Sequence, residues 1–230
     1  MIATKAGSDF YAQPIRRRYD REHLRRALER SLERLRTDHV DLFQLHDPPV
    51  SAILDEETIG ALLELKQQGL ARHIGASVHT LEEARAVVQA GVYETLQIAY
   101  SVAYQWVPNR VLARAAEAGL GVIAREPLAQ GLLSGRYDRH YRFPEGDWRA
   151  SIGQELRDYL DELCAAMRRY FHQRRGLDRP LAAIALQLPL AHPAVSTVIV
   201  SCKTPAQVDR NAEVLELEPL DAQALAWLRE

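Results

Sequence analysis

Hydrophobic positions along this chain follow two alternating patterns. Short apolar runs, too short for helices, alternate with longer segments in which apolar residues recur at helical spacing. The segment 20–36 is the clearest of the second kind, with leucines and alanines on one face and arginines and glutamates on the other. The chain therefore reads as strands and amphipathic helices in alternation.

The positions of these runs predict the elements. We expect strands at 1–5, 40–45, 72–77, 95–100, 121–125 and 195–200. Helices are predicted at 20–36, 56–68, 80–90, 108–118, 152–174, 180–190, 204–215 and 221–229, and a long ordered loop at 126–149. Strands that alternate with helices require right-handed crossovers and a parallel sheet, so the fold class is α/β. Since no linker-like composition divides the chain, we expect a single domain over 1–230.

The amino-acid composition argues against several classes of binding partner. The chain has 29 basic and 31 acidic residues, interleaved along its length, which is no footprint for nucleic acid or for an anionic membrane. No apolar run approaches the roughly 20 residues of a membrane span. The histidines and the two cysteines, Cys164 and Cys202, lack metal-ligand spacing, so we expect no metal site. Unpaired cysteines favour a reducing, cytoplasmic location.

Candidate chemistry gathers at the predicted strand ends. In α/β folds, ligands bind beyond the carboxyl ends of the strands, whether the sheet is open or closed into a barrel. The residues that close the predicted strands are Lys5, His46, Ser77, Gln97 or Tyr100, Arg125 and the turn at 201–204. These residues form one candidate rim.

Six stretches, taken in order, resemble one known family. They are IATK at 2–5, VDLFQLHDP at 40–48, GLARHIGAS at 69–77, LQIAYS at 96–101, EPLAQGLLSGRY at 126–137 and TVIVSCKTPAQVDRN at 197–211. Together they resemble the aldo-keto reductases, and within them the branch of bacterial enzymes and potassium-channel β-subunits. The resemblance implies a (β/α)8 TIM-type barrel that binds NADP(H) and reduces aldehydes or ketones.

The same resemblance implies a truncated barrel and an incomplete catalytic set. Family members carry a hairpin and two further strands before the position of Ile2, so we expect about six β/α units here. Lys5 and His46 match the family's catalytic lysine and histidine, but the family's catalytic tyrosine and aspartate have no counterpart. Tyr100 and Tyr104 are the only nearby phenols that we expect.

Cofactor residues also follow from the resemblance. Ser77 and Gln97 match the contacts to the nicotinamide amide, and Arg125 stands where many members have a stacking aromatic residue. Matches to the pyrophosphate loop and the adenine end are Leu128, Gly131, Arg136, Lys203, Gln207 and Asn211. Lys203 favours a 2′-phosphate and hence NADP(H). Departures from the family pattern are Val78, Val200, Ser201 and Arg210.

Three functions remain open at this point. The first is an NADP(H)-linked reductase of small carbonyl compounds, impaired by the absent strands. The second is a divergent, non-redox enzyme that uses His46 and Lys5 for proton transfer. The third is a non-catalytic binding or regulatory subunit. A barrel that lacks two strands leaves open sheet edges, so a homo-oligomer that covers those edges is expected.

Overall fold

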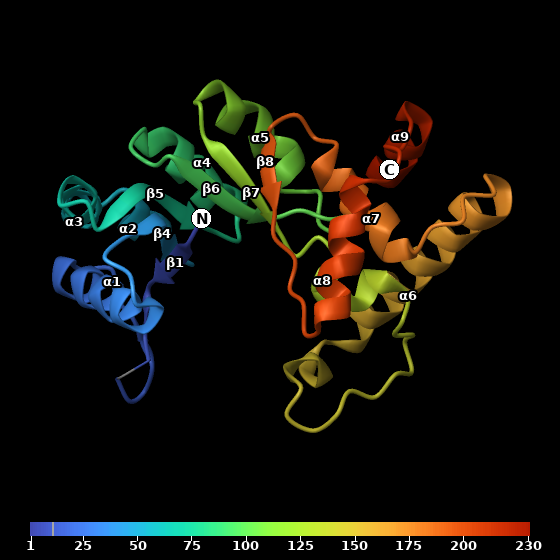
Figure 1. Ribbon diagram of the computed structural model, residues 1–230, viewed down its shortest axis with the longest axis horizontal. Helices are drawn as coiled ribbons and strands as arrows, with labels where there is room; N and C mark the ends of the chain where they lie inside the picture. Colours follow the sequence, from blue (N-terminus) through green and yellow to red (C-terminus); the bar gives the residue numbers. More distant parts are fainter. Residues whose placement is uncertain (11) are drawn as a thin grey trace. The chain divides into compact units, whose positions relative to one another are not determined.

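Strands and helices alternate along nearly the whole chain. The computed structural model describes residues 1–10 and 12–230. They group into two units, one formed by Met1–Ile98 with Val107–Ile123 and the other by Ala99–Trp106 with Ala124–Glu230. Figure 1 labels the elements of each unit. The expectation of a single domain over 1–230 stays a prediction.

One sheet contains six strands in the order β1-β4-β5-β6-β7-β8. They are β1 (Ala3–Ala6), β4 (Val40–His46), β5 (Ala71–Ser77), β6 (Thr95–Ala99), β7 (Gly121–Arg125) and β8 (Val195–Val198). Pairing is parallel between β1 and β4, between β4 and β5, and between β5 and β6. The predicted α/β class with a parallel sheet is confirmed.

In the first unit, helices lead from each strand to the next (Figure 1). They are α1 (Arg21–Leu35), α2 (Val50–Ile53), α3 (Glu56–Gln67), α4 (Leu81–Ala90) and α5 (Pro108–Glu117). Asp20, Asp55 and Thr80 cap α1, α3 and α4, each accepting a backbone N–H from three residues further on. Such caps satisfy N–H groups that have no partner inside the helix. They explain why these predicted starts lie within one residue of the observed starts.

The first unit also contains short elements that hydrophobic periodicity does not reveal. Strand β2 (Ser8–Asp9) pairs antiparallel with β3 (Arg16–Arg17) between the predicted strand at 1–5 and the predicted helix at 20–36, where no element was predicted. Helix α2 follows directly after the two prolines that end β4. Elements this short have no room for a repeating apolar pattern, which needs a longer window.

The second unit is built from helices and strand β8. Its elements are η1 (Ala129–Ser134), η2 (Trp148–Ser151), α6 (Gln154–Met167), η3 (Arg168–Arg174), α7 (Leu181–Leu190), α8 (Pro205–Ala212), η4 (Glu213–Leu215) and α9 (Ala222–Arg229). Helices η1, η2 and η4 are 3₁₀ turns. Ala183, Leu186 and Val214 form an apolar cluster against which Leu128 and Val198 pack.

One predicted helix differs from the observed structure. The segment 152–174 is α-helical only over α6, and η3 continues it as a π-helix. Tyr170 and Phe171 of η3 both pack against Trp227, the first ring stacked at 4.5 Å and the second edge-on at 5.5 Å between centroids. The wider turn of a π-helix allows the rings of two consecutive residues to contact the same tryptophan. Because this contact is between distant parts of the chain, the periodicity of the sequence does not predict it.

Gly75 allows two polar side chains to meet over the middle of the sheet. In the parallel register Gly75 lies between Gln44 on β4 and Thr95 on β6. Gln44 Nε2 donates a hydrogen bond to Thr95 Oγ1 at 3.3 Å. A Cβ atom on Gly75 would overlap Thr95 Oγ1 and lie 2.7 Å from the Thr95 carbonyl oxygen. The position therefore excludes any side chain.

We predict opposite effects for two glycine-to-alanine substitutions. Gly75→Ala should lower the free energy of unfolding by about 1–3 kcal/mol, because the added methyl group has to displace backbone of β6. Gly60→Ala in α3 should raise it by about 0.5–1 kcal/mol, because alanine favours a helix and the nearest atom to a Cβ there is 3.5 Å away. Urea unfolding followed by circular dichroism measures both, and equal stabilities would contradict the steric reading of Gly75.

Candidate functional site

Four of the residues singled out by the sequence lie together in the first unit. His46 ends β4 in register with Ser77 at the end of β5, and Ser77 is in register with Gln97 on β6. Lys5 on β1 is in register with Gln44, two residues before His46. Since side chains in a strand alternate between faces, these residues share one face of the sheet.

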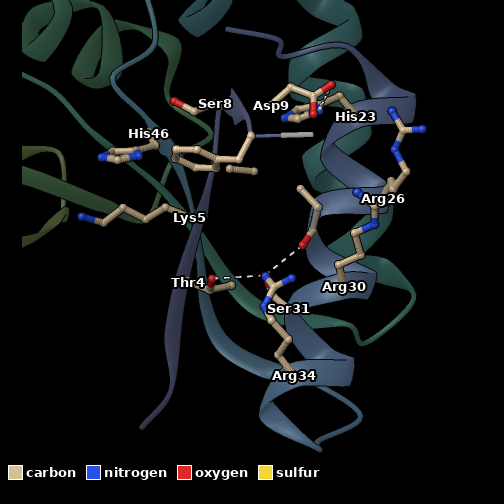
Figure 2. Close-up of a pocket in the computed structure, with 14 residues that line it drawn as sticks. Thr4, Lys5, Ser8, Asp9, His23, Arg26, Arg30, Ser31, Arg34 and His46 are labelled. Atoms are coloured by element: carbon tan, nitrogen blue, oxygen red, sulfur yellow. Dashed lines mark hydrogen bonds and ion pairs between the residues drawn. The ribbon is translucent and has the colours of Figure 1, made fainter. Parts of the chain in front are cut away.

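Direct contact links the two outer members of this group. Lys5 Nζ donates a hydrogen bond to Gln97 Oε1, across the two strands that separate β1 from β6. Figure 2 shows the side chains of Lys5 and His46 pointing to the same side, away from helix α1. Ser77 and Gln97 are only 1% and 3% exposed. Lys5 and His46 therefore present accessible polar ends, whereas Ser77 and Gln97 are buried polar side chains of the same face, here called the polar floor.

A cavity of about 300 Å³ lies beside β1. Its lining includes Lys5, His46, Asp9, Arg26, Arg30 and Arg34. Figure 2 shows the three arginines extending from α1 along the cavity, on the side opposite to the Lys5 and His46 tips. Ser77 and Gln97 are not among the described residues that line it.

Gln44 is a member of the polar floor that the sequence reading missed. It is fully buried, and its Oε1 has no hydrogen-bond partner among the residues that the structure describes. Buried polar atoms are almost always hydrogen-bonded, so an exception at a candidate site is informative. The available signal was a glutamine in the middle of the apolar run VDLFQL, on the same face as His46.

The surroundings of His46 favour its neutral form. Burial lowers the pKa of the imidazole below its usual value of 6.5, and Lys5, Arg17 and His79 lower it further, whereas Asp47 raises it. His46 Nε2 lies 3.8 Å from Asp47 Oδ2. A neutral imidazole keeps one N–H donor and one acceptor nitrogen, so His46 is suited to hydrogen-bond a carbonyl oxygen.

Tyr19 corrects the expectation that Tyr100 and Tyr104 are the only nearby phenols. The Tyr19 hydroxyl lies 2.9 Å from the His46 carbonyl oxygen and 2.7 Å from the Asp47 carbonyl oxygen, to which it donates. Tyr100 belongs to the second unit and is 1% exposed, with its ring edge-on to His192, and burial raises its pKa. Tyr100 is therefore a packing residue. Tyr19 was missed because the pattern gives no hint that the loop before α1 folds back onto the end of β4.

The other predicted cofactor residues lie in the second unit. Lys203, Gln207 and Asn211 come together where β8 leads into α8, and Gln207 Oε1 accepts a hydrogen bond from the Lys203 backbone N–H at 2.6 Å. Asn211 Nδ2 donates to Cys202 Sγ at 3.2 Å. Lys203 Nζ lies 3.7 Å from Asp147 Oδ2. An ammonium and two amides therefore stand side by side in this turn.

Asp147 is a charge partner in this region that sequence reasoning did not single out. Hydrogen bonds from Arg149 hold the pKa of the Asp147 carboxyl well below its usual range. The Arg149 guanidinium also lies over the rings of Tyr137 and Phe143, at 5.1 and 4.4 Å from their centroids. These contacts anchor the segment between η1 and α6 near Lys203.

The segment after β7 is held in an unusual backbone conformation. Glu126, Ala129, Gln130 and Gly131 all have positive φ, and only the last is a glycine. Such angles cost energy for other residues and persist where surrounding structure imposes them, often at functional sites. Leu128, Gly131 and Arg136 lie on or beside this segment, and Leu128 packs against the apolar cluster of the unit.

Arg125 closes β7 and is paired with its neighbour in the chain. Its Nη1 donates to Glu126 Oε1, and its side chain is 11% exposed. A paired guanidinium presents less charge to a bound ring than an isolated one. The Glu126 carboxylate therefore offsets part of the positive charge at the end of β7.

Among residues 1–10 and 12–230, no group of three or more histidine, cysteine, aspartate or glutamate side chains is arranged to hold a metal ion. In the same part of the chain, no helix combines the length and the apolar character needed to cross a membrane.

The chain is similar in sequence to a known reductase and to a known dehydrogenase. The L-glyceraldehyde 3-phosphate reductase of Escherichia coli O157:H7 is 28% identical over 99% of this chain, and L-galactose dehydrogenase of Arabidopsis thaliana is 30% identical over 96%. The matches span 68% and 65% of those two proteins, so the chain covers about two thirds of their length.

Solved structures give the same result. The holo form of the aldo-keto reductase AKR11C1 from Bacillus halodurans superposes with a TM-score of 0.79 at 30% identity, over 99% of this chain and 71% of that one. The sheet described above corresponds to strands of that (β/α)8 barrel type. The model of the Aldo/keto reductase family matches residues 1–230. The chain belongs to the aldo/keto reductase family.

Proposed function

We propose that this chain reduces aldehydes or ketones with NADP(H), and that His46 and Lys5 contact the carbonyl oxygen. The observation that carries the proposal is the shared face of Lys5, His46, Ser77 and Gln97 at the carboxyl ends of adjacent parallel strands. Family membership supports a small carbonyl compound as substrate. The relatives compared here are a sugar-phosphate reductase and a sugar dehydrogenase, which suits a short, polar aldehyde.

The residues of the first unit would stabilise charge on the reacting oxygen. When bound, the reduced nicotinamide supplies the hydride that the carbonyl carbon accepts. The oxygen then carries developing negative charge, and N–H donors aimed at that oxygen lower the barrier. Lys5 Nζ, which donates to Gln97 Oε1, and the single N–H of neutral His46 are the donors that would serve this role. Ser77 and Gln97 are positioned to orient the carboxamide of the cofactor.

The second unit has residues of its own that suit the nucleotide part of the cofactor. The donor set Lys203, Gln207 and Asn211 fits a phosphorylated adenosine, since an ammonium pairs with phosphate and amides hydrogen-bond a purine. The positive φ angles that end at Gly131 support a backbone that approaches a pyrophosphate closely, with Arg136 as its charge partner. Arg125 and Leu128, which the family resemblance also marks, are further candidates for contacts to the cofactor.

We further propose that reduction by this chain is slow. Loss of a general acid typically costs about 10²- to 10⁴-fold in rate, and the phenol described beside His46 does not serve as one. Tyr19 does not substitute, because its hydroxyl is committed to the carbonyl oxygens of His46 and Asp47. Burial is the main reason why the pKa of the Tyr19 hydroxyl is raised above its usual value.

NADPH oxidation with a panel of short aldehydes tests the proposed reaction. We expect slow but measurable turnover, and His46→Ala should reduce kcat/KM by about 10²-fold, the effect of removing one donor to the developing oxyanion. His39→Ala is the matched control, since His39 lies just before β4 at the opposite end of the strand and pairs with Asp38. Equal activity of His46→Ala and His39→Ala would remove His46 from the mechanism.

Fluorescence titration with NADPH tests the proposed cofactor. Lys203→Ala should weaken NADPH binding by about 10- to 100-fold, since a charge-assisted hydrogen bond contributes about 1.5–3 kcal/mol. NADH, which lacks the 2′-phosphate, should bind the variant as it binds the parent chain. Unchanged NADPH affinity rules out Lys203 as the phosphate partner. Tight NADPH binding without any turnover would favour a binding or regulatory subunit.

We propose a cytoplasmic homo-oligomer in which copies of the chain cover the end strands of the sheet, β1 and β8. Uncovered strand edges pair readily with other chains, which supports self-association. The free thiols Cys164 and Cys202 suit a reducing compartment. Sedimentation equilibrium should give a multiple of the 26.0 kDa chain mass, rising with concentration. A mass of one chain at every concentration would contradict the oligomer.

A further inference from the structure

Asp47 is held in place from several directions. It follows β4 with φ of 51°, in the left-handed region that non-glycine residues rarely adopt. Its backbone N–H donates to the Ser77 carbonyl oxygen at 2.9 Å. Its own carbonyl oxygen accepts from Tyr19 Oη at 2.7 Å and from Arg17 Nη1 at 2.6 Å. A strained residue with this many anchors next to a candidate site points to a role for its side chain.

The Asp47 carboxylate lies between two imidazoles. Oδ1 is 2.8 Å from His79 Nε2, and Oδ2 is 3.8 Å from His46 Nε2. The Asp47 side chain is 19% exposed, against 42% for His46 and 55% for His79. One carboxylate, more buried than either ring, is therefore within reach of both histidines.

We propose that Asp47 is a positioning residue for His46, and that its carboxylate is shared with His79, so that the charge on His79 governs how readily His46 takes up and releases a proton. This inference rests on the proposed function only in assigning His46 to the carbonyl oxygen. It gives roles to two residues, Asp47 and His79, to which the family resemblance assigns none.

The charges around His46 give the direction of each effect. Lys5 from β1, Arg17 from β3 and His79 from the turn before α4 all disfavour the imidazolium, in addition to burial. Asp47 opposes them. When His79 is protonated, it takes a larger share of the carboxylate, and His46 loses support. Since the two rings interact through one group, their protons are gained and lost in coupled steps.

The proton has a defined path in the proposed reduction. Because its pKa is lowered, His46 is mostly neutral near neutral pH, and the protonated fraction is the form that can give up a proton. As the carbonyl carbon accepts hydride, the carbonyl oxygen takes a ring N–H proton from that fraction, which leaves the ring neutral. Water returns a proton to the ring, which is partly exposed. Asp47 remains a carboxylate throughout and stabilises the protonated ring between turnovers.

Histidine titration by NMR on the full chain, labelled in the imidazole rings, tests this inference without any turnover. In Asp47→Asn the pKa of His46 should fall by about 1 unit, the lower end of the effect of an opposite charge at this range. In His79→Gln the pKa of His46 should rise, because the competing cation is gone. Asp47→Glu, which keeps the carboxylate, should retain most of the parent value.

Asp38→Asn is the matched control. Asp38 Oδ1 lies 2.6 Å from His39 Nδ1 at the other end of β4, so this substitution removes a carboxylate beside a different histidine and should leave the titration of His46 unchanged. If Asp47→Asn does not fold, His79→Gln decides by itself, since His79 lies at the surface. An unchanged His46 titration in His79→Gln overturns the sharing of the carboxylate, and an unchanged one in Asp47→Asn overturns the whole inference.

Kinetics separate this inference from the proposed function. Where turnover is measurable, kcat/KM should decline as the pH rises through the lowered pKa of His46, and Asp47→Asn should move that decline to still lower pH by the shift seen in NMR. An inactive chain whose two histidines titrate together leaves the inference standing and removes the reductase proposal. If the chain is active and its two histidines titrate independently, the reductase proposal stands and this inference is overturned.

Discussion

The parallel register of β4 with its neighbours is the constraint on which the candidate site depends. It sets His46 beside Ser77, and Gln44 beside Lys5 and Gly75. Because side chains alternate along a strand, a shift by one residue would turn every polar group of β4 into the helix layer and bring Phe43 and Leu45 to the site. Burial of those two apolar side chains therefore holds the polar face in position.

Strain is concentrated where each unit carries its candidate chemistry. In the first unit it lies at Asp47, directly after β4, and in the second at Glu126, Ala129 and Gln130, after β7; the other such residue that the structure describes, Arg36, ends helix α1. Left-handed angles at non-glycine residues are unfavourable, so neighbouring contacts have to maintain them. At Asp47 these are hydrogen bonds to backbone atoms, which place a carboxylate between two histidines that the strands alone would not bring together.

Three cations that the sequence marked as candidate ligand contacts lie next to polar or acidic partners in the structure. Lys5 is bonded to Gln97, Arg125 to Glu126, and Lys203 lies near Asp147. Each of these cations was identified for its charge, yet each is partly neutralised or oriented by a neighbour. A ligand would have to compete with these contacts, so affinity at such positions reflects a difference between two pairings.

The sequence by itself determined the α/β class, the six strands and most helix limits, because apolar periodicity and capping side chains are local properties. It also identified Lys5, His46, Ser77 and Gln97, since all four lie at or near the ends of apolar runs. Only the tertiary structure decided the contacts of Tyr19, Asp47 and His79, and the buried position of Gln44. Those depend on loops that return to a strand end and on register between strands, which no local pattern encodes.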